Sequence, residues 1–280
     1  MSPGALVTDS PQTFEIHACA TRGENINATV RKAASLSRRD SVPFDAVVLA
    51  GGASSRMGDL ARVVPKSLLP WGDAPIVDAI LTELAEAGCE HVVVLTGTAQ
   101  SRLVGDHLEA ANKTWGITVS LHDSGLSDLS ASLKDLPWGY AAESVVIAHC
   151  DELIDPALTR TIAETSRGRA CPVIAAYDGC LRSKRIVELS EINPVGPADG
   201  VLPTHRFVGR YAIPARVLED AFEANVKFEN ILEILEAYRA RGRTVLEVSS
   251  GSRYWDLGTL GRYTHAWRER LKLLEESNLS

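Results

Sequence analysis

Apolar residues occur in this chain in short runs, separated by stretches in which they recur at helical spacing. The runs occupy residues 46–50, 91–96, 117–121, 144–148 and 172–177. Runs of this length are typical of strands that are buried on both faces of a parallel sheet. Between the first two runs, apolar side chains recur at helical spacing from Ile76 to Leu84, and the pattern stops at Gly88. The pattern therefore predicts an α/β fold with a mostly parallel central sheet and helices on both faces.

The C-terminal third of the chain has a different rhythm. Strands are predicted at residues 207–213 and 244–248, with a helix at about residues 230–241 between them. An amphipathic helix is predicted at residues 263–274. We expect these elements to form a β/α extension of one domain that covers residues 44–280.

The first 43 residues are rich in Ser, Thr, Ala and Arg and carry few large apolar side chains. We predict a flexible N-terminal extension over residues 1–43, with a short helical pattern at residues 26–36. A transit peptide is the alternative, because several arginines occur there. Such peptides are poor in acidic residues, whereas this segment contains Asp9, Glu15, Glu24 and Asp40.

Charge and composition narrow the classes of partner. The net charge of -7 and the pI near 5.6 argue against a nucleic-acid binder, which needs a concentrated basic surface, but they allow a small anionic ligand. The five cysteines form no C-x-x-C pair, so neither a zinc cage nor a disulfide framework is indicated. No apolar stretch approaches 18 residues and the N-terminus lacks a secretion signal. We therefore expect a cytoplasmic protein that does not bind a membrane.

A glycine turn with two nearby cations is the strongest chemical signal. The sequence L-A-G-G-A-S-S-R-M occupies residues 49–57, and P-K follows at residues 65–66. Two glycines after a buried strand let the backbone approach a ligand, and successive N–H groups form a concave anion site. Ser54 and Ser55 add hydroxyl donors, Arg56 a planar fork and Lys66 a compact cation. The nucleotide-binding residues predicted at this triphosphate cradle are Leu49, Ala50, Gly51, Gly52, Ala53, Ser54 and Ser55, and the predicted catalytic residues are Arg56 and Lys66.

Two common phosphate-binding motifs do not fit this segment. It lacks the Gly-Lys-Ser/Thr ending of the Walker A loop and the G-x-G-x-x-G of dinucleotide-binding domains, so kinase and dehydrogenase readings lose their main support. The two glycines alone would more often be an ordinary turn, and only their combination with the later cations indicates a binding site.

The combined pattern resembles the nucleotidylyltransferase superfamily, whose members share an L-A-G-G-x-x-S/T-R turn and a later P-K. The resemblance covers about residues 44–270 and implies a single Rossmann-like domain, similar to the GT-A fold, whose C-terminal extension lies on the acceptor side. It implies that residues 50–55 and Arg56 hold the nucleotide and that Lys66 contacts the α-phosphate. One departure is Ser54, because sugar-phosphate members usually carry a third Gly there.

Two acidic residues complete the resemblance. Asp151 follows an apolar run, at the point where the family places a metal-binding Asp, and ligands of open α/β sheets gather at that edge. Asp256 lies in Y-W-D-L-G-T at residues 254–259, which is similar to the family's W-x-D-x-G/D-T signature. Both acids and a triphosphate would suit Mg²⁺, which prefers oxygen ligands. The alternatives are that Asp151 or the nearby Asp155 is a turn or cap residue and that His149 only packs in the interior.

The resemblance implies in-line attack by an acceptor oxygen on the α-phosphorus, with release of pyrophosphate. The expected partners are a nucleoside triphosphate, either CTP or UTP/dTTP, and a small anionic acceptor; whether the protein is a homodimer stays open. Residues 122–136, which include S-D-L-S-A-S-L at residues 127–133, are similar to a segment of compact cytidylyltransferases that act on phosphocholine or phosphonates, and Ser132 in this segment is a nucleotide-binding candidate. Tyr211 and Trp255 are acceptor-binding candidates, although Trp255 could equally be a core aromatic residue.

Several alternatives remain at this stage. The Phe207–Tyr211 strand resembles sugar 1-phosphate nucleotidylyltransferases, whereas R-M-G at residues 56–58 resembles molybdopterin cytidylyltransferases. A non-catalytic nucleotide or sugar sensor would not need both Asp151 and Asp256. A glycosyltransferase would usually carry a D-x-D motif, whereas Asp151 is followed directly by Glu152.

Overall fold

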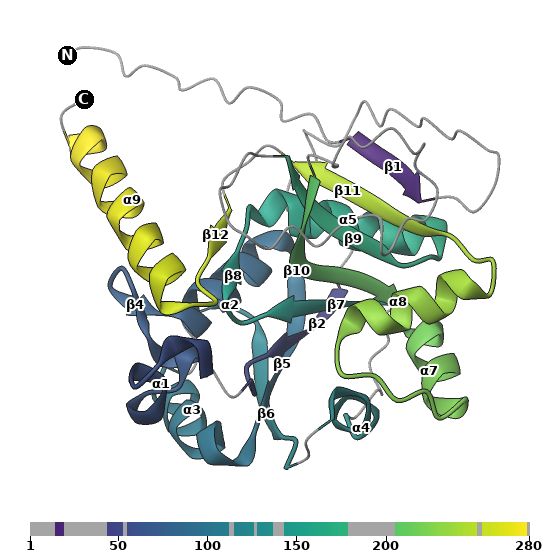
Figure 1. The fold of residues 1–280 in the computed structure, drawn as a ribbon, viewed down its shortest axis with the longest axis horizontal. Coiled ribbons are helices and arrows are strands. Elements are labelled where there is room, and N and C mark those ends of the chain that lie inside the picture. The colour runs from purple at the N-terminus through teal and green to yellow at the C-terminus, as the bar shows by residue number, and fades with distance from the viewer. Residues whose placement is uncertain are drawn as a thin grey trace.

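The fold of the protein was obtained as a computed structural model, which describes residues 15–19, 44–52, 55–111, 115–125, 128–136, 143–178, 205–250 and 254–278. An eight-stranded sheet has the strand order β1-β11-β9-β10-β7-β2-β5-β6 (Figure 1). These strands are β1 (Glu15–Cys19), β2 (Phe44–Leu49), β5 (Cys89–Thr96), β6 (Thr118–Asp123), β7 (Ser144–His149), β9 (Val173–Asp178), β10 (His205–Pro214) and β11 (Val245–Ser250). Two short ribbons pair β3 (Pro70–Trp71) with β4 (Ala74–Pro75) and β8 (Glu152–Leu153) with β12 (Trp255–Asp256).

The sheet is mostly parallel, as the sequence predicts. β7, β2, β5 and β6 are parallel neighbours, and β9 is parallel to β11. β10 is antiparallel to both β7 and β9, and β1 is antiparallel to β11. The carboxyl ends of β2, β5 and β7 therefore meet at one edge, where α/β sheets gather their ligands.

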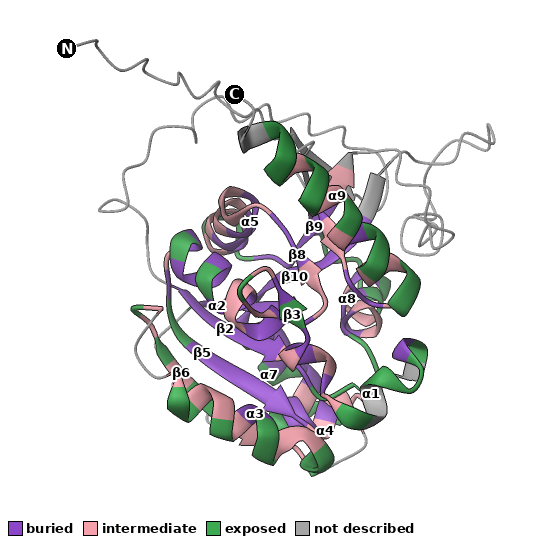
Figure 2. Ribbon diagram, turned by 90° about the vertical axis from the view of Figure 1, so that its left-hand side faces the viewer, coloured by how far each residue is buried: buried purple, intermediate pink, exposed green. Residues whose placement is uncertain are grey.

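Helices cover both faces of the sheet. The α-helices within the described residues are α1 (Leu60–Val63), α2 (Ile76–Ala87), α3 (Thr98–Ala110), α4 (Leu129–Lys134), α5 (Pro156–Arg169), α7 (Ala215–Glu223), α8 (Ile231–Ala240) and α9 (Leu260–Asn278). Successive residues of β2 point to opposite faces, so Ala46 and Val48 pack with α2 and α5, while Val47 packs with α4, α7 and α8. Figure 2 shows the central strands as buried and much of α3 and α9 as exposed.

Local sequence signals account for the helix boundaries next to the site. In α2 the apolar residues at helical spacing are fully buried, and the helix ends at Gly88, whose φ of 101° suits glycine. α5 begins at the predicted cap: the Asp155 carboxylate accepts a hydrogen bond from the Ala157 N–H at 2.8 Å, and Pro156 occupies the first turn.

The N-terminal part of the chain contains a strand that the sequence pattern does not predict. β1 pairs with β11 at the edge of the sheet, so the sheet includes residues that precede residue 44 in the chain. The helical pattern at residues 26–36 lies outside the described residues, and the boundary at residue 44 stays a prediction. None of the helices in the described ranges combines the length and the hydrophobicity that a membrane-spanning helix needs.

Candidate active site

The predicted glycine turn leaves β2 between the ends of β5 and β7. The Ala50 N–H donates to the Leu95 carbonyl at 2.8 Å, and the Cys150 N–H donates to the Leu49 carbonyl at 3.2 Å. A Cβ at Gly51 would lie 2.9 Å from the Gly97 nitrogen, so only glycine lets the turn pack this closely on the backbone.

The turn is also open to a ligand. Gly51 and Gly52 are both exposed, and the Gln100 side chain donates to the Gly52 carbonyl at 3.2 Å. The predicted binding residues Ala53 and Ser54 lie outside the described residues. Ser55 begins a 3-10 turn at Ser55–Met57 that also carries Arg56.

Lys66 lies at the start of a second 3-10 turn, Lys66–Leu68, after the buried Pro65. Its ammonium nitrogen is 2.6 Å from the Asp151 carboxylate, and both side chains are largely buried. Burial alone would raise the pKa of Asp151, but the nearby Lys66 and Arg56 charges outweigh it and hold that pKa below its ordinary value. The structure thus brings one predicted cation directly to one predicted metal ligand, with Arg56 within electrostatic reach.

Asp256 is held beside Asp151 by backbone pairing. In the ribbon of β8 and β12, Asp256 pairs with Glu152, and the Leu257 N–H donates to the Asp151 carbonyl at 2.7 Å. Both acids lie beside Gly258: a Cβ there would be 2.9 Å from one oxygen of Asp151 and 3.1 Å from one oxygen of Asp256. These two oxygens are therefore no farther apart than the sum of those distances, about 6 Å.

Asp256 has two further partners that orient its carboxylate. The Gly258 N–H donates to it at 2.9 Å, and the Arg262 guanidinium donates at 2.6 Å. The Thr259 hydroxyl, directly before α9, accepts a hydrogen bond from the Arg262 backbone N–H at 3.3 Å, which places Arg262 in the first turn of the helix. The sequence analysis does not predict a role for Arg262, because no motif in the adjacent sequence points to it. The feature that could have indicated this role is its position one helical turn after the D-x-G-T segment.

His149 and Glu152 lie next to the two acids. One possible ligand atom from each of His149, Asp151 and Glu152 lies within 4.8 Å of the others. The His149 ring packs against the Gly209 backbone and lies 5.6 Å from the Tyr211 ring. Burial lowers the pKa of His149 and outweighs the opposing effect of Asp151, which favours a neutral imidazole. The expectation that His149 packs in the interior agrees with these contacts.

The remaining three candidates, Ser132, Tyr211 and Trp255, are buried or half-buried, unlike the exposed glycine turn. Ser132 is buried in α4, and its hydroxyl donates to the Asp128 carbonyl at 2.8 Å. Tyr211 is buried in the core on the side of α7 and α8. Trp255 is half-buried and meets the Trp71 ring edge-on at 5.3 Å. Their roles in binding stay predictions; in the fold Ser132 makes a hydrogen bond to the backbone, and Tyr211 and Trp255 pack against other side chains.

The C-terminal helix joins two parts of the site. α9 begins four residues after Asp256, and its Tyr263 and Trp267 both donate to the Pro70 carbonyl, at 2.6 and 3.2 Å. The Arg270 guanidinium lies over the Trp71 ring at 5.0 Å. α9 is therefore attached to the β3–β4 ribbon, which begins directly after the Lys66 turn.

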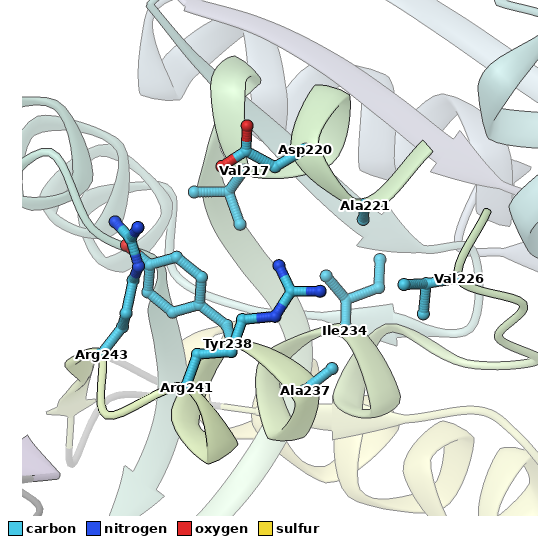
Figure 3. Close-up of a pocket in the computed structure, with 9 residues that line it drawn as sticks. All are labelled: Val217, Asp220, Ala221, Val226, Ile234, Ala237, Tyr238, Arg241 and Arg243. Carbon is cyan, nitrogen blue, oxygen red and sulfur yellow. The ribbon is translucent and has the colours of Figure 1, made fainter. Parts of the chain in front are cut away.

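A separate pocket between α7 and α8 has no predicted site residue in its wall (Figure 3). Its lining includes Tyr238, Arg241 and Arg243, and the Arg243 guanidinium lies 5.6 Å from the centre of the Tyr238 ring. The glycine turn and the two acids contribute nothing to this pocket.

Comparison with known sequences identifies one family. The sequence profile described as "MobA-like NTP transferase domain" matches residues 46–247. This stretch includes the glycine turn, Lys66 and Asp151, and it ends before Asp256.

Individual relatives match shorter segments. UTP–glucose-1-phosphate uridylyltransferase 1 of Staphylococcus saprophyticus is 30% identical over 89 residues, which is 32% of this chain and 30% of the relative. Molybdenum cofactor guanylyltransferase of Xanthomonas euvesicatoria is 48% identical over 52 residues, which is 19% of this chain and 25% of the relative. These alignments span less than a third of either relative.

Solved structures resemble a larger part of the chain. Apo-UDP-glucose pyrophosphorylase has a TM-score of 0.63 at 18% identity, and the match covers 82% of this chain and 99% of that one. A structure titled as a putative glucose-1-phosphate thymidylyltransferase from Bacillus anthracis also has a TM-score of 0.63, at 16% identity, with 80% of this chain and 94% of that one covered. At such low identity these matches establish the fold.

Proposed function

Because this chain belongs to the MobA-like NTP transferase domain family, we propose that it transfers a nucleoside monophosphate from a nucleoside triphosphate to a small phosphorylated or phosphonate acceptor, releasing pyrophosphate. One observation carries the proposal: Lys66, Asp151 and Asp256 converge beside the exposed glycine turn. A protein that only binds nucleotide has no need for a second carboxylate at this point.

The two carboxylates fit a bound Mg²⁺. Their oxygens flank a space that a single methyl carbon at Gly258 would fill, and both are hard oxygen donors. We propose that Asp151 and Asp256 hold the ion there together with substrate phosphates. When bound, Mg²⁺ would neutralise part of the triphosphate charge and orient the phosphates. The ammonium of Lys66 already pairs with Asp151, which supports a preference of this space for cations.

The chain's own groups would position two anions that repel each other. The N–H groups of the glycine turn would bind the triphosphate, and Arg56 would pair with its oxygens. Lys66 would neutralise the charge that develops at the α-phosphate as the acceptor oxygen attacks and pyrophosphate leaves. No covalent intermediate with the protein is needed, because attack in line with the leaving group completes the transfer.

A sugar 1-phosphate is the acceptor class to be tested first. Relatives in sequence and in fold are named for glucose-1-phosphate uridylyl transfer and UDP-glucose, which favours this class for the present chain. For the nucleotide we propose CTP or UTP/dTTP. Phosphocholine, small phosphonates and molybdopterin are the other candidate acceptors. The match to molybdenum cofactor guanylyltransferase supports molybdopterin.

A pyrophosphate assay tests the proposal directly. The protein is incubated with Mg²⁺ and each of CTP, UTP, dTTP, GTP and ATP, alone and with sugar 1-phosphates, phosphocholine, a phosphonate or molybdopterin. We expect pyrophosphate only where one nucleotide and one acceptor are both present. Nucleotide binding without pyrophosphate from any pair would contradict the proposal and indicate a sensor. In a parallel incubation with nucleotide sugars and no triphosphate, release of a nucleoside diphosphate would indicate a glycosyltransferase.

The Gly258→Ala variant is expected to weaken the metal site while both acids are retained. The new methyl group would lie within 3.1 Å of both carboxylates, so at least one of them must move. We expect metal affinity and kcat to fall by roughly 10- to 100-fold, as for other changes that misorient ligands. Mn²⁺ titration and steady-state kinetics measure these effects.

Gly261→Ala is the matched control. Gly261 lies in α9, three residues from Gly258, and a Cβ there would meet nothing within 4 Å. Since alanine favours helix over glycine by about 1 kcal/mol, this variant should be as active as wild type and no less stable. Equal metal affinity in both variants would mean that the space beside Gly258 holds no ion.

A further inference from the structure

Arg210 is fully buried although it carries a charge. It lies in β10, opposite Ala148 of β7, and none of its side chain is exposed. Its guanidinium pairs with Glu83 of α2 through Nε and Nη2, at 3.1 and 2.6 Å. A buried ion pair is weak evidence for stability, because packed apolar residues of similar volume often stabilise a fold as well or better. The pair therefore needs another explanation.

The other hydrogen bonds of Arg210 supply that explanation. Nη1 donates to the carbonyls of His149 and Gly209, at 3.2 and 3.0 Å, and Nη2 donates to the Glu152 carbonyl at 2.8 Å. Together with the two bonds to Glu83, all five N–H groups of the guanidinium are used. The carbonyls of His149 and Glu152 are the two ends of the turn that contains Asp151.

Glu83 anchors this arrangement to two helices. Besides Arg210, its carboxylate accepts from the Thr159 hydroxyl of α5 at 2.7 Å and from the Ile154 N–H at 3.4 Å. The charge pair therefore connects α2, α5 and β10 directly beneath the turn. A lysine could keep the charge but could not supply the planar fork that reaches two carbonyls and a carboxylate at once.

The same turn also locates the second acid. Asp151 accepts the Leu257 N–H through its carbonyl, and Glu152 pairs with Asp256 in the ribbon of β8 and β12. A shift of the backbone at residues 149–152 would therefore move the Asp151 carboxylate and disturb the backbone pairing that sets its distance from Asp256.

We propose that Arg210 is a positioning residue that fixes the turn at residues 149–152, and with it the spacing of the Asp151 and Asp256 carboxylates, and that Glu83 holds its guanidinium in place. The inference rests on the proposed function, because it assigns a role to the spacing of the two metal-binding acids. Arg210 itself touches neither carboxylate and acts through the backbone.

The test compares Arg210→Met with the double variant Glu83→Leu/Arg210→Met. The single variant leaves a buried carboxylate unpaired and is expected to lower the melting temperature strongly. The double variant removes both charges and is expected to recover most of that loss. Its Mn²⁺ affinity, measured from the free-ion electron paramagnetic resonance signal, should still be about 10- to 100-fold weaker than wild type, and kcat should fall in parallel. The KM for the nucleotide should change much less.

Two further variants make the result decisive. Arg210→Lys retains the charge opposite Glu83, so it should fold even if the double variant does not, and it should show the same weakened Mn²⁺ binding. Asp78→Ala/His107→Ala removes a pair with a separation of 2.7 Å that links α2 to α3 and lies outside the acidic turn. This control should bind Mn²⁺ as wild type does.

The possible failures can be distinguished. Wild-type Mn²⁺ affinity and kcat in folded Glu83→Leu/Arg210→Met or Arg210→Lys protein would overturn the positioning role and leave the proposed function intact. If wild type itself shows no saturable Mn²⁺ binding that Asp151→Asn removes, the metal site and the positioning role fail together.

Discussion

The Asp151→Asn variant is expected to lose turnover by at least about 10³-fold, because removal of a metal-binding charge costs several kcal/mol of transition-state stabilisation. Asparagine keeps the size of the side chain, and the Leu257 N–H bonds to the backbone of Asp151, so the fold should be retained. Pyrophosphate release under saturating nucleotide and acceptor measures the loss. Added Mg²⁺ or Mn²⁺ should not restore the rate.

The same variant has a defined pH signature in EDTA. Because the folded-state pKa of Asp151 is depressed, its ionised form stabilises the protein above the unfolded-state pKa of about 3.9, and this contribution is lost as the pH falls. The difference in melting temperature between wild type and variant should therefore shrink toward acid pH. Turnover within tenfold of wild type would exclude Asp151 as a metal ligand.

The Lys66→Ala variant is expected to lower kcat by about 10²- to 10³-fold, the usual cost of removing one group that stabilises developing charge. The KM for the nucleotide should change by less than about tenfold, because the glycine turn and Arg56 still bind the ground state. Lys66→Arg should not restore the rate, since a planar fork does not replace a compact ammonium at 2.6 Å from Asp151.

Lys272→Ala is the matched control for this prediction. Lys272 is exposed in α9, where it pairs with Glu269 at 2.8 Å, and its removal should leave the kinetic constants unchanged. A rise in the KM for the nucleotide without any fall in kcat after the Lys66→Ala change would assign Lys66 to ground-state binding and contradict a role in the transfer step.

Much of the site could be predicted from the sequence because it depends on parallel strands. The buried runs that become β2 and β7 lie side by side, so the glycine turn and Asp151, which follow them, emerge at the same edge. The rule that ligands gather at the carboxyl ends of such strands then predicts their proximity. Asp256 was predicted only through resemblance, because the two-residue strands β8 and β12 are too short to give a periodic pattern.

Other features depend on contacts that no local pattern reveals. Arg210 and Glu83 are 127 residues apart, and each occurs in a segment whose apolar neighbours alone define a strand or a helix. Sequence periodicity does not show that these two charged side chains are buried together. It also does not show that Arg210 donates hydrogen bonds to both ends of the turn at residues 149–152. β1 was missed for a related reason: its five residues lie in a polar segment, and its pairing with β11 is also long-range.

The attachment of α9 to the Pro70 carbonyl has a mechanical consequence. Asp256 lies four residues before the start of this helix, and Pro70 lies four residues after Lys66, so α9 connects the segments that carry the acid and the ammonium although they are far apart in the chain. A movement of Lys66 away from Asp256 would therefore have to break the contacts of α9 with Pro70. Asp151 is held in the same framework, because the Leu257 N–H donates to its carbonyl and the Lys66 ammonium pairs with its carboxylate.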